Sequence, residues 1–286
     1  MSMFDKPILV FQTDFTYAEG AVSSMYGVVK TVDRELEIFD GTHQIPQYDT
    51  WSASYRLYQS LQFWPEGTIY VSVVDPGVGT KRRACVAKVK GGYYVVTPDN
   101  GSLTHLKKFV GIEAVREIDE TINRLPRSGE SYTFHGRDVY AYTGARLASG
   151  IIDFEGVGPA LDPESLTSLP IVEPYIDGKA ACGTIDVLDV RFGSLWTNIP
   201  RTMFLETGIR YGDRFSITIE NDTRCVYRNI ILFAKSFADV YVGEALAYVN
   251  SLDCVAVAIN QGSFARAYNI GTGNSWRIRI APFKGF

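Results

Sequence analysis

The sequence predicts two domains of different fold class: an α/β domain with a largely parallel sheet, followed by a small antiparallel β-barrel or sandwich. In the first half, short apolar runs alternate with stretches of helical periodicity, a pattern typical of βαβ units. In the second half, short strand-like segments are separated by turn residues, and helical periodicity is rare. Residues 162–178 are rich in proline, so we place the boundary there, between domains of residues 1–171 and 172–286.

The first domain begins with alternating strands and helices. Residues 8–13 form an apolar run that predicts a buried strand, and apolar residues at helical spacing predict a helix over 20–33. A second strand is expected over 35–40, and Asp49 is suited to cap the helix that follows. A third strand, of the fully buried type, covers 68–75. This order favours parallel strands joined by crossover helices.

The remaining elements complete the two domains. Gly91 and Gly92 separate two apolar β-type runs and predict a hairpin. A helix is expected over 138–149, because Gly150 follows its last apolar residue. The second domain is predicted to consist of short strands over 183–190, 214–220, 225–233, 244–250, 254–260 and 276–282.

The composition argues against several classes of protein. The chain has 286 residues and a formal net charge of −4, which gives no electrostatic support to nucleic-acid binding. It has no apolar run of about 18 residues, and its first residues do not resemble a signal peptide, so we expect a cytoplasmic protein without a membrane partner. The four cysteines form no CxxC pair and the three histidines share no metal-ligand spacing. We therefore expect neither a disulfide framework nor a metal site.

Polar residues collect where the predicted strands of the first domain end. Asp14, His43, Asp75 and Asp99 each follow such a strand, and His135 precedes the last helix. A single acid in such a place is usually a helix cap or a turn residue. Parallel sheets, however, bind their ligands at the carboxyl ends of their strands. The number of polar strand ends therefore predicts a ligand site at this edge of the sheet.

The segment DPGVGTKR, residues 75–82, is the most informative of these strand ends. Its two glycines permit tight turns and a close approach of backbone to ligand. Arg82 or Arg83 could fold back toward Asp75 and keep the carboxylate ionised. The alternative is a glycine-rich turn with a surface ion pair, which contributes little. The segment matches neither a P-loop nor a dinucleotide-binding fingerprint.

Motifs along nearly the whole chain resemble the S-adenosylmethionine hydrolase family. They are TDF at 13–15, GTH at 41–43, DPGVGTKR at 75–82, PDNG at 98–101, FHGRD at 134–138, FGSLWTNIP at 192–200, FADV at 237–240 and NSLDCVAVAINQGS at 250–263. The family is also called S-adenosylmethionine hydroxide adenosyltransferase, and it is related to the fluorinases and chlorinases. The resemblance implies an α/β domain, a C-terminal β-barrel, and a homotrimer whose active sites lie between the N-terminal domain of one subunit and the C-terminal domain of its neighbour.

The resemblance also implies a reaction. S-adenosylmethionine is the small-molecule substrate, no further cofactor takes part, and water attacks the ribose 5′ carbon to give adenosine and L-methionine. Asp75, Arg82 and His135 match the catalytic positions of the hydrolases. For the halogenases, the resemblance implies Tyr at the first of these positions and a small residue at the third. The small residue leaves room for a halide. The acid and the imidazole favour water, and which group of the cluster takes the proton stays open.

Contacts to the nucleoside are implied by motif position. Asp14 is expected to accept hydrogen bonds from the ribose hydroxyls, because a carboxylate can accept from both. Tyr48 and Phe192 are expected to stack on adenine, with Trp196 and Phe237 as further candidates for the same apolar wall. Ordinary core packing is the alternative for the last two.

Contacts to the methionine part and to the adenine edge follow in the same way. Asp189 is expected to pair with the ammonium group of the substrate, and Ser251 to bind its carboxylate. Backbone groups near Asn260 and Gln261 are expected to meet the edge of adenine.

Some positions depart from the family pattern. Glu19 and Ser194, both candidate substrate contacts, stand where the family usually has Asp and Asn. These departures leave two alternatives open: a protein that binds S-adenosylmethionine or adenosine with negligible turnover, and a halide-using adenosyl transferase.

Overall fold

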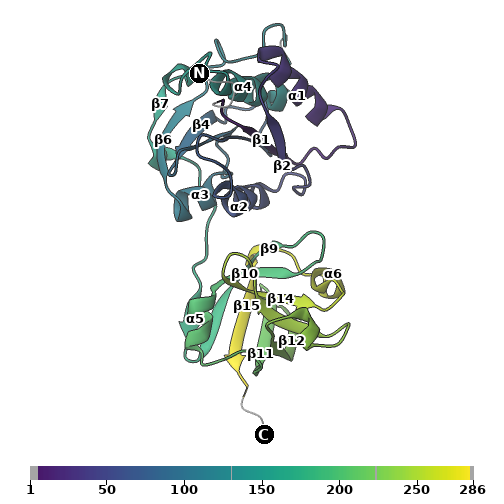
Figure 1. Cartoon of the computed structure of the whole chain (residues 1–286). Helices are drawn as coiled ribbons and strands as arrows, with labels where there is room; N and C mark the ends of the chain where they lie inside the picture. Colours follow the sequence, from purple (N-terminus) through teal and green to yellow (C-terminus); the bar gives the residue numbers. More distant parts are fainter. Residues whose placement is uncertain (1–5, 130, 223, 284–286) are drawn as a thin grey trace. The chain divides into compact units, whose positions relative to one another are not determined.

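The computed structural model describes residues 6–129, 131–222 and 224–283. The chain divides into two compact units, Met1–Leu169 and Pro170–Phe286, each with its own sheet and hydrophobic core (Figure 1).

Within the described residues, unit 1 contains a seven-stranded sheet in the order β2-β1-β3-β5-β4-β6-β7. Its strands are β1 Leu9–Thr13, β2 Ile38–Thr42, β3 Ile69–Val73, β4 Ala84–Val89, β5 Tyr93–Pro98, β6 Ile112–Glu117 and β7 Ala160–Leu161. The first four in the spatial order pair in parallel, and β4, β6 and β7 continue the sheet with antiparallel pairs. The hairpin predicted around Gly91 and Gly92 is the β4–β5 pair.

Helices cover both faces of this sheet (Figure 1). They are α1 Ala21–Val32, α2 Thr50–Leu61, α3 Thr104–Phe109, the π-helix η1 Gly136–Ala141, α4 Tyr142–Ala148, and the short 3₁₀ turns η2 Glu155–Val157 and η3 Pro163–Ser165. Alternate residues of a strand point to opposite faces. Phe11 of β1 accordingly packs in the cluster with α1 and α4, whereas Val10 packs with Leu57 of α2 and Leu106 of α3. Because both faces of the sheet are covered, every residue of β1 and β3 is buried, including the polar Gln12 and Ser72.

Two local features confirm or refine the expected helices of unit 1. Asp49 caps α2 as predicted, because its carboxylate accepts a hydrogen bond from the Ser52 amide at 2.9 Å. The helix expected over 138–149 begins two residues earlier and starts with a π-helical turn, η1, before it becomes α4. Gly144 lets α4 lie close to the sheet, since a Cβ there would stand 2.8 Å from Cγ2 of Val71.

Unit 2 is a closed β-barrel. Its strands are β8 Tyr175–Asp177, β9 Ala180–Leu188, β10 Leu195–Pro200, β11 Arg214–Asn221, β12 Arg224–Phe233, β13 Ala245–Val249, β14 Cys254–Ile259 and β15 Gly273–Pro282. The order β10-β14-β13-β12-β11-β15-β9 closes because β9 also pairs with β10, and β8 adds to β9 outside the ring. The pairs are antiparallel except β12–β13, which is parallel. Closure removes the unpaired strand edges that an open sheet would present.

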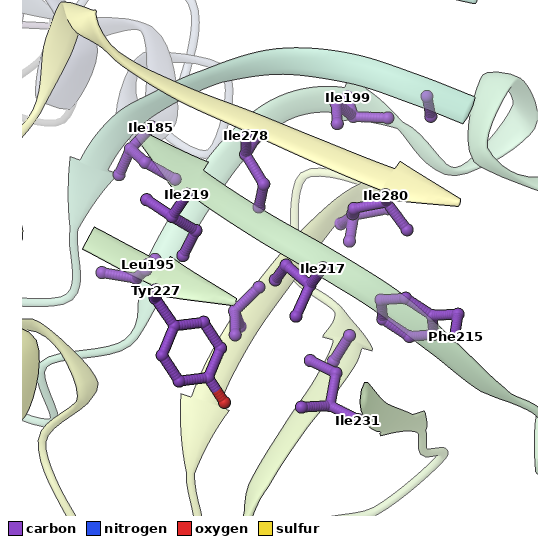
Figure 2. Packing of buried hydrophobic residues seen from close by; sticks show 14 of the residues in the cluster. Ile185, Leu195, Ile199, Phe215, Ile217, Ile219, Tyr227, Ile231, Ile278 and Ile280 are labelled. Atoms are coloured by element: carbon purple, nitrogen blue, oxygen red, sulfur yellow. The ribbon is translucent and has the colours of Figure 1, made fainter. Parts of the chain in front are cut away.

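The barrel interior is filled mainly by branched aliphatic side chains. Figure 2 shows Ile217 and Ile219 of β11 together with Ile278 and Ile280 of β15, all labelled in one contiguous cluster. The cluster is extended by Phe204 of helix α5 (Arg201–Glu206), and two further short helices are η4 Phe237–Asp239 and α6 Phe264–Tyr268. No helix among the described residues is both long enough and apolar enough to span a bilayer.

Candidate functional site

Two acidic side chains meet at the carboxyl ends of neighbouring parallel strands in unit 1. β1 and β3 pair in parallel with Thr13 opposite Val73. Asp14 follows β1 directly and Asp75 lies two residues beyond β3, and the negative charge of Asp75 helps to raise the pKa of Asp14, although burial is the larger cause. The sheet topology therefore brings together two acids that stand 61 positions apart in the sequence.

The glycine-rich loop after β3 folds back so that Arg82 forms an ion pair with Asp75. Arg82 Nε donates to Asp75 Oδ1 at 2.9 Å, and Nη2 donates to Oδ2 at 2.5 Å. The two side chains are only 10% and 6% exposed, so this is a bidentate ion pair held largely away from water. Gly79, with φ of +76°, makes the turn possible and passes close to the backbone oxygen of Tyr132.

The neighbouring Arg83 points to a different acid. Its guanidinium donates to Asp99 Oδ2 and to the backbone oxygen of Ser165. Asp99 also accepts from the Thr167 amide, and Asn100 donates to the backbone oxygen of Val74 at 2.9 Å. The PDNG motif thus ties the end of unit 1 to the sheet and braces the strand end that carries Asp75.

His135 is the third member of the cluster and has a defined hydrogen-bonding state. Its Nδ1 lies 2.9 Å from Arg82 Nη2. Because a guanidinium can only donate, Nδ1 must accept, and the proton of the neutral ring must sit on Nε2. Nε2 is buried and meets no hydrogen-bond partner among the residues that the structure describes. It is therefore a donor without a protein acceptor, on a side chain that lines the cavity described below.

The electrostatics of the cluster agree with this assignment. Burial lowers the pKa of His135, and the positive charges of Arg82 and Arg124 lower it further against the opposing effect of Glu120. The imidazole is therefore neutral near pH 7. Burial also acts to lower the pKa of Arg82, but the hydrogen bonds and charge of Asp75 outweigh it and raise that pKa overall.

A cavity of about 690 Å³ opens beside the cluster in unit 1. Asp14, Glu19, Tyr48, Asp75 and His135 all line it, so the structure brings together the predicted site residues of the first domain apart from Arg82, which lies behind Asp75. The amide of Tyr48 donates to Asp14 Oδ2 at 2.9 Å, and the Tyr48 side chain is 64% exposed at the rim. The size lies within the range of small-molecule sites.

His43 of the GTH motif stabilises the backbone that carries Asp14, next to this cavity. His43 is buried, with Nδ1 2.8 Å from Thr13 Oγ1 and Nε2 2.9 Å from the Tyr26 hydroxyl. Thr13 Oγ1 in turn accepts from the Phe15 amide at 3.1 Å. His43 therefore fixes the backbone on both sides of Asp14 and does not itself line the cavity.

A second cavity, of about 710 Å³, lies in unit 2 at the ends of β10 and β14. Six of the predicted site residues line it: Asp189, Phe192, Ser194, Phe237, Asn260 and Gln261. Trp196 and Ser251 do not line it. Trp196 is buried within β10, and Ser251 stands in the turn between β13 and β14, at the other end of β14 from Asn260.

The sequence reasoning missed Tyr248, which also lines the second cavity. Its hydroxyl lies near the Ser194 side chain, which acts to lower its pKa, and its ring centroid lies 5.1 Å from that of Phe237. Burial raises the pKa of Tyr248, so the hydroxyl stays protonated and can donate. A polar-tipped aromatic in a strand otherwise made of aliphatic residues (ALAYV) was the available signal.

Family models match both units. The N-terminal domain of the SAM hydroxide adenosyltransferases matches residues 9–158, and the C-terminal domain of the same family matches residues 183–277. Both the order and the extent of the two matches correspond to the two units of the structure.

Known proteins are similar over almost the whole chain. An (R)-S-adenosyl-L-methionine hydrolase of Salinispora tropica is 34% identical, covering 96% of this chain and 99% of that protein. A fluorinase of Actinopolyspora mzabensis is 24% identical, covering 96% of this chain and 98% of that protein. The crystal structure of an uncharacterized conserved protein from Thermotoga maritima superposes with a TM-score of 0.86 at 32% identity, covering 96% of this chain and all of that one. The chain therefore belongs to the SAM hydroxide adenosyltransferase family.

Proposed function

We propose that this protein hydrolyses S-adenosyl-L-methionine to adenosine and L-methionine. The observation that carries the proposal is the buried Asp75–Arg82–His135 cluster at the wall of the first cavity. It combines a carboxylate held in place by a guanidinium with an N–H donor that has no acceptor among the described residues, which is an arrangement suited to hold one water molecule. The family membership and the hydrolase relatives support the same reaction.

The proposed reaction is a displacement at the ribose 5′ carbon. The water oxygen forms a bond to this carbon while the carbon–sulfur bond breaks, and the electron pair of that bond stays on sulfur. Methionine leaves as a neutral thioether, so its departure needs neither a metal nor a general acid. The released proton passes to Asp75, whose Oδ1 accepts only Arg82 Nε among the described residues and so has room for a water proton.

The cluster assigns different tasks to its members. Asp75 orients the water and takes its proton. Arg82 holds the carboxylate in one orientation by its two hydrogen bonds. His135 is neutral and protonated at Nε2. It donates a hydrogen bond to the water oxygen and does not act as the base. The main contribution of the site is thus a positioned nucleophile in a place with little competing water.

The substrate contacts are distributed over the two cavities. We propose that Asp14 holds the ribose hydroxyls and that Tyr48 covers the nucleoside in the first cavity. In the second cavity, Phe192 and Phe237 provide the apolar wall for adenine, and Asp189 binds the methionine ammonium. Asn260 and Gln261 are proposed to bind the adenine edge, and Ser251, which stands outside this cavity, the methionine carboxylate.

A homotrimer is part of the proposal. Each cavity supplies only some of the groups that the substrate needs: the catalytic cluster lines one, and the predicted adenine wall lines the other. A site assembled from the first cavity of one subunit and the second cavity of its neighbour combines both sets.

Product analysis in labelled water tests the reaction. Incubation with S-adenosylmethionine in ¹⁸O-water is expected to give adenosine that carries the label at its 5′ oxygen, and unlabelled methionine. A single-turnover experiment with enzyme in excess separates an enzyme from a protein that only binds. If no adenosine forms over hours, hydrolysis is excluded and binding without turnover is the function.

The fluorinase relatives make halide transfer the second reaction to examine. His135 stands at the position where the family resemblance implies a small residue in the halogenases, so we expect no halide product. Incubation with chloride and analysis for 5′-chloro-5′-deoxyadenosine decides the question, and formation of this compound at a rate comparable to adenosine would contradict the assignment.

A further inference from the structure

Tyr140 is a fully buried residue in direct contact with the catalytic cluster. Its hydroxyl donates to Asp75 Oδ2 at 3.2 Å, and its ring centroid lies 5.5 Å from Cζ of Arg82. It therefore meets both members of the ion pair at once, one by a hydrogen bond and the other by the face of its ring.

The π-helix η1 explains how Tyr140 reaches this position. His135 is the residue that immediately precedes η1, and Tyr140 lies within it, five residues further along. Backbone hydrogen bonds in a π-helix join residues five apart, so these two side chains project from the same side of the turn. In an α-helix, five residues correspond to a rotation that would direct them about 140° apart. The π-helical turn thus lets one short segment contribute two groups to the cluster.

The hydroxyl of Tyr140 can act only as a donor to the carboxylate. Burial is the largest cause that raises the pKa of Tyr140, and the negative charge of Asp75 raises it further, so the phenol stays protonated. Asp75 Oδ2 then accepts two hydrogen bonds, from Arg82 Nη2 and from Tyr140. Within the part of the chain that the structure describes, Asp75 Oδ1 accepts one, from Arg82 Nε. The two oxygens of the carboxylate are therefore no longer equivalent.

We propose that Tyr140 is a positioning residue of the hydrolysis, which saturates Asp75 Oδ2 and so directs Oδ1 alone to the attacking water. This inference rests on the proposed function. Tyr140 does not contact the water or the substrate. It acts through Asp75, by fixing which oxygen is free, and through Arg82, by supporting the guanidinium from the face of its ring.

The test is the Tyr140→Phe variant, which keeps the ring and removes only the hydroxyl. We expect kcat to fall about tenfold or more, the loss that corresponds to a hydrogen bond with a charged group, and KM for S-adenosylmethionine to stay within about twofold. Tyr142→Phe is the matched control, because Tyr142 follows η1 and its ring contacts Arg146 rather than the cluster. It is expected to keep the wild-type kcat.

A double-mutant cycle distinguishes action through Asp75 from a general structural effect. In the Asp75→Asn background, Tyr140→Phe is expected to cause no further loss of kcat, because the carboxylate that it positions is already absent. A full, additive loss in that background overturns the inference, as does a wild-type kcat for Tyr140→Phe alone. The proposed function itself fails in a different way, by the absence of adenosine formation in the unmodified protein.

Discussion

Arg82 and Arg83 are adjacent in the sequence, yet they serve different acids. Arg82 holds Asp75 at the cavity, and Arg83 holds Asp99 beside Ser165. Both residues lie in irregular backbone just before β4, and their side chains diverge there, so that only Arg82 faces the strand end that carries Asp75. Arg82 also sets the tautomer of His135. Its guanidinium can only donate, so Nδ1 of His135 must accept and the ring proton lies on Nε2.

At the residue scale, Asp75 should be required for rate and not for binding. Asp75→Asn keeps the shape and one acceptor oxygen but cannot take a proton at neutral pH. We expect a fall of about 10²-fold or more in kcat, measured as adenosine release, with substrate binding retained by calorimetry. Asp33→Asn is a suitable control, since Asp33 pairs with Lys6 away from the site. Near-normal turnover of Asp75→Asn would exclude its role as the base.

A second prediction at this scale concerns Tyr248. Its hydroxyl and Ser194 provide hydroxyl groups in the mostly apolar second cavity, so we expect it to contact the substrate. Tyr248→Phe should raise KM by about threefold to tenfold, the range for one uncharged hydrogen bond, and change kcat less. Tyr211→Phe serves as the control, because this ring stacks on Phe233 outside the cavity. An unchanged KM for Tyr248→Phe would remove Tyr248 from the binding site.

At the scale of elements, the packing of α2 against α3 creates a third buried histidine, which differs from His43 and His135 in its surroundings. His105 of α3 lies among the aromatic rings of α2. Its ring centroid is 4.6 Å from that of Trp51, and its ring stacks on that of Tyr58. Its Nδ1 contacts Ser54 Oγ at 2.9 Å. Burial lowers the pKa of His105 to about 4. This histidine belongs to the helix–helix contact and not to the catalytic site.

This contact predicts how stability depends on pH. The unfolded chain binds a proton at His105 below its ordinary pKa of 6.5, and the folded chain does so only below about 4. The contribution of His105 to the free energy of unfolding is therefore fully present above pH 6.5 and is lost as the pH falls toward 4. The contribution of His105 is at most about 3 kcal/mol. His43 and His135, whose pKa values burial also lowers, act in the same direction.

Denaturant unfolding at several pH values measures this contribution. His105→Phe should make the free energy of unfolding fall less steeply than that of the wild type between pH 6.5 and 4. Any loss of packing in the variant is present at every pH, so the slope isolates the titration. Equal slopes for the two proteins would show that His105 is not the group responsible.

At the scale of the whole molecule, each unit carries its own cavity, and neither cavity contains all of the predicted site. A trimer that shares its sites predicts a mass near three times the 31.8 kDa of one chain in sedimentation. A monomeric mass would contradict the trimer.

Mixing two variants that are each impaired in a different cavity tests the sharing of sites directly. Asp75→Asn inactivates the first cavity and Asp189→Asn weakens the second. When chains of both kinds are unfolded and refolded together, some sites combine an intact first cavity from one chain with an intact second cavity from the other. We expect adenosine formation to recover in the mixture. No recovery, with mixed oligomers demonstrated, would show that each site lies within one chain.

Much of the fold could be predicted because it depends on local patterns. The buried strands β1 and β3, the capped helix α2 and the hairpin β4–β5 each follow from a short run of residues. The strands β6 and β10 were not expected. In β10, the polar Thr197 and Asn198 interrupt the apolar pattern, and the strand is specified instead by its irregular pairing with β9 and β14.

The sequence by itself determined the two fold classes, the family, and the acids that follow the strands, because hydrophobic periodicity and motif spacing are properties of contiguous segments. Only the tertiary structure showed that Arg82 holds Asp75 by two hydrogen bonds while Arg83 holds Asp99, and that Tyr248 joins the second cavity. It also decided that a π-helical turn places Tyr140 against the ion pair. The contact between Tyr140 and Asp75 joins residues 65 positions apart, and it is set by strand order and helix packing rather than by a local pattern.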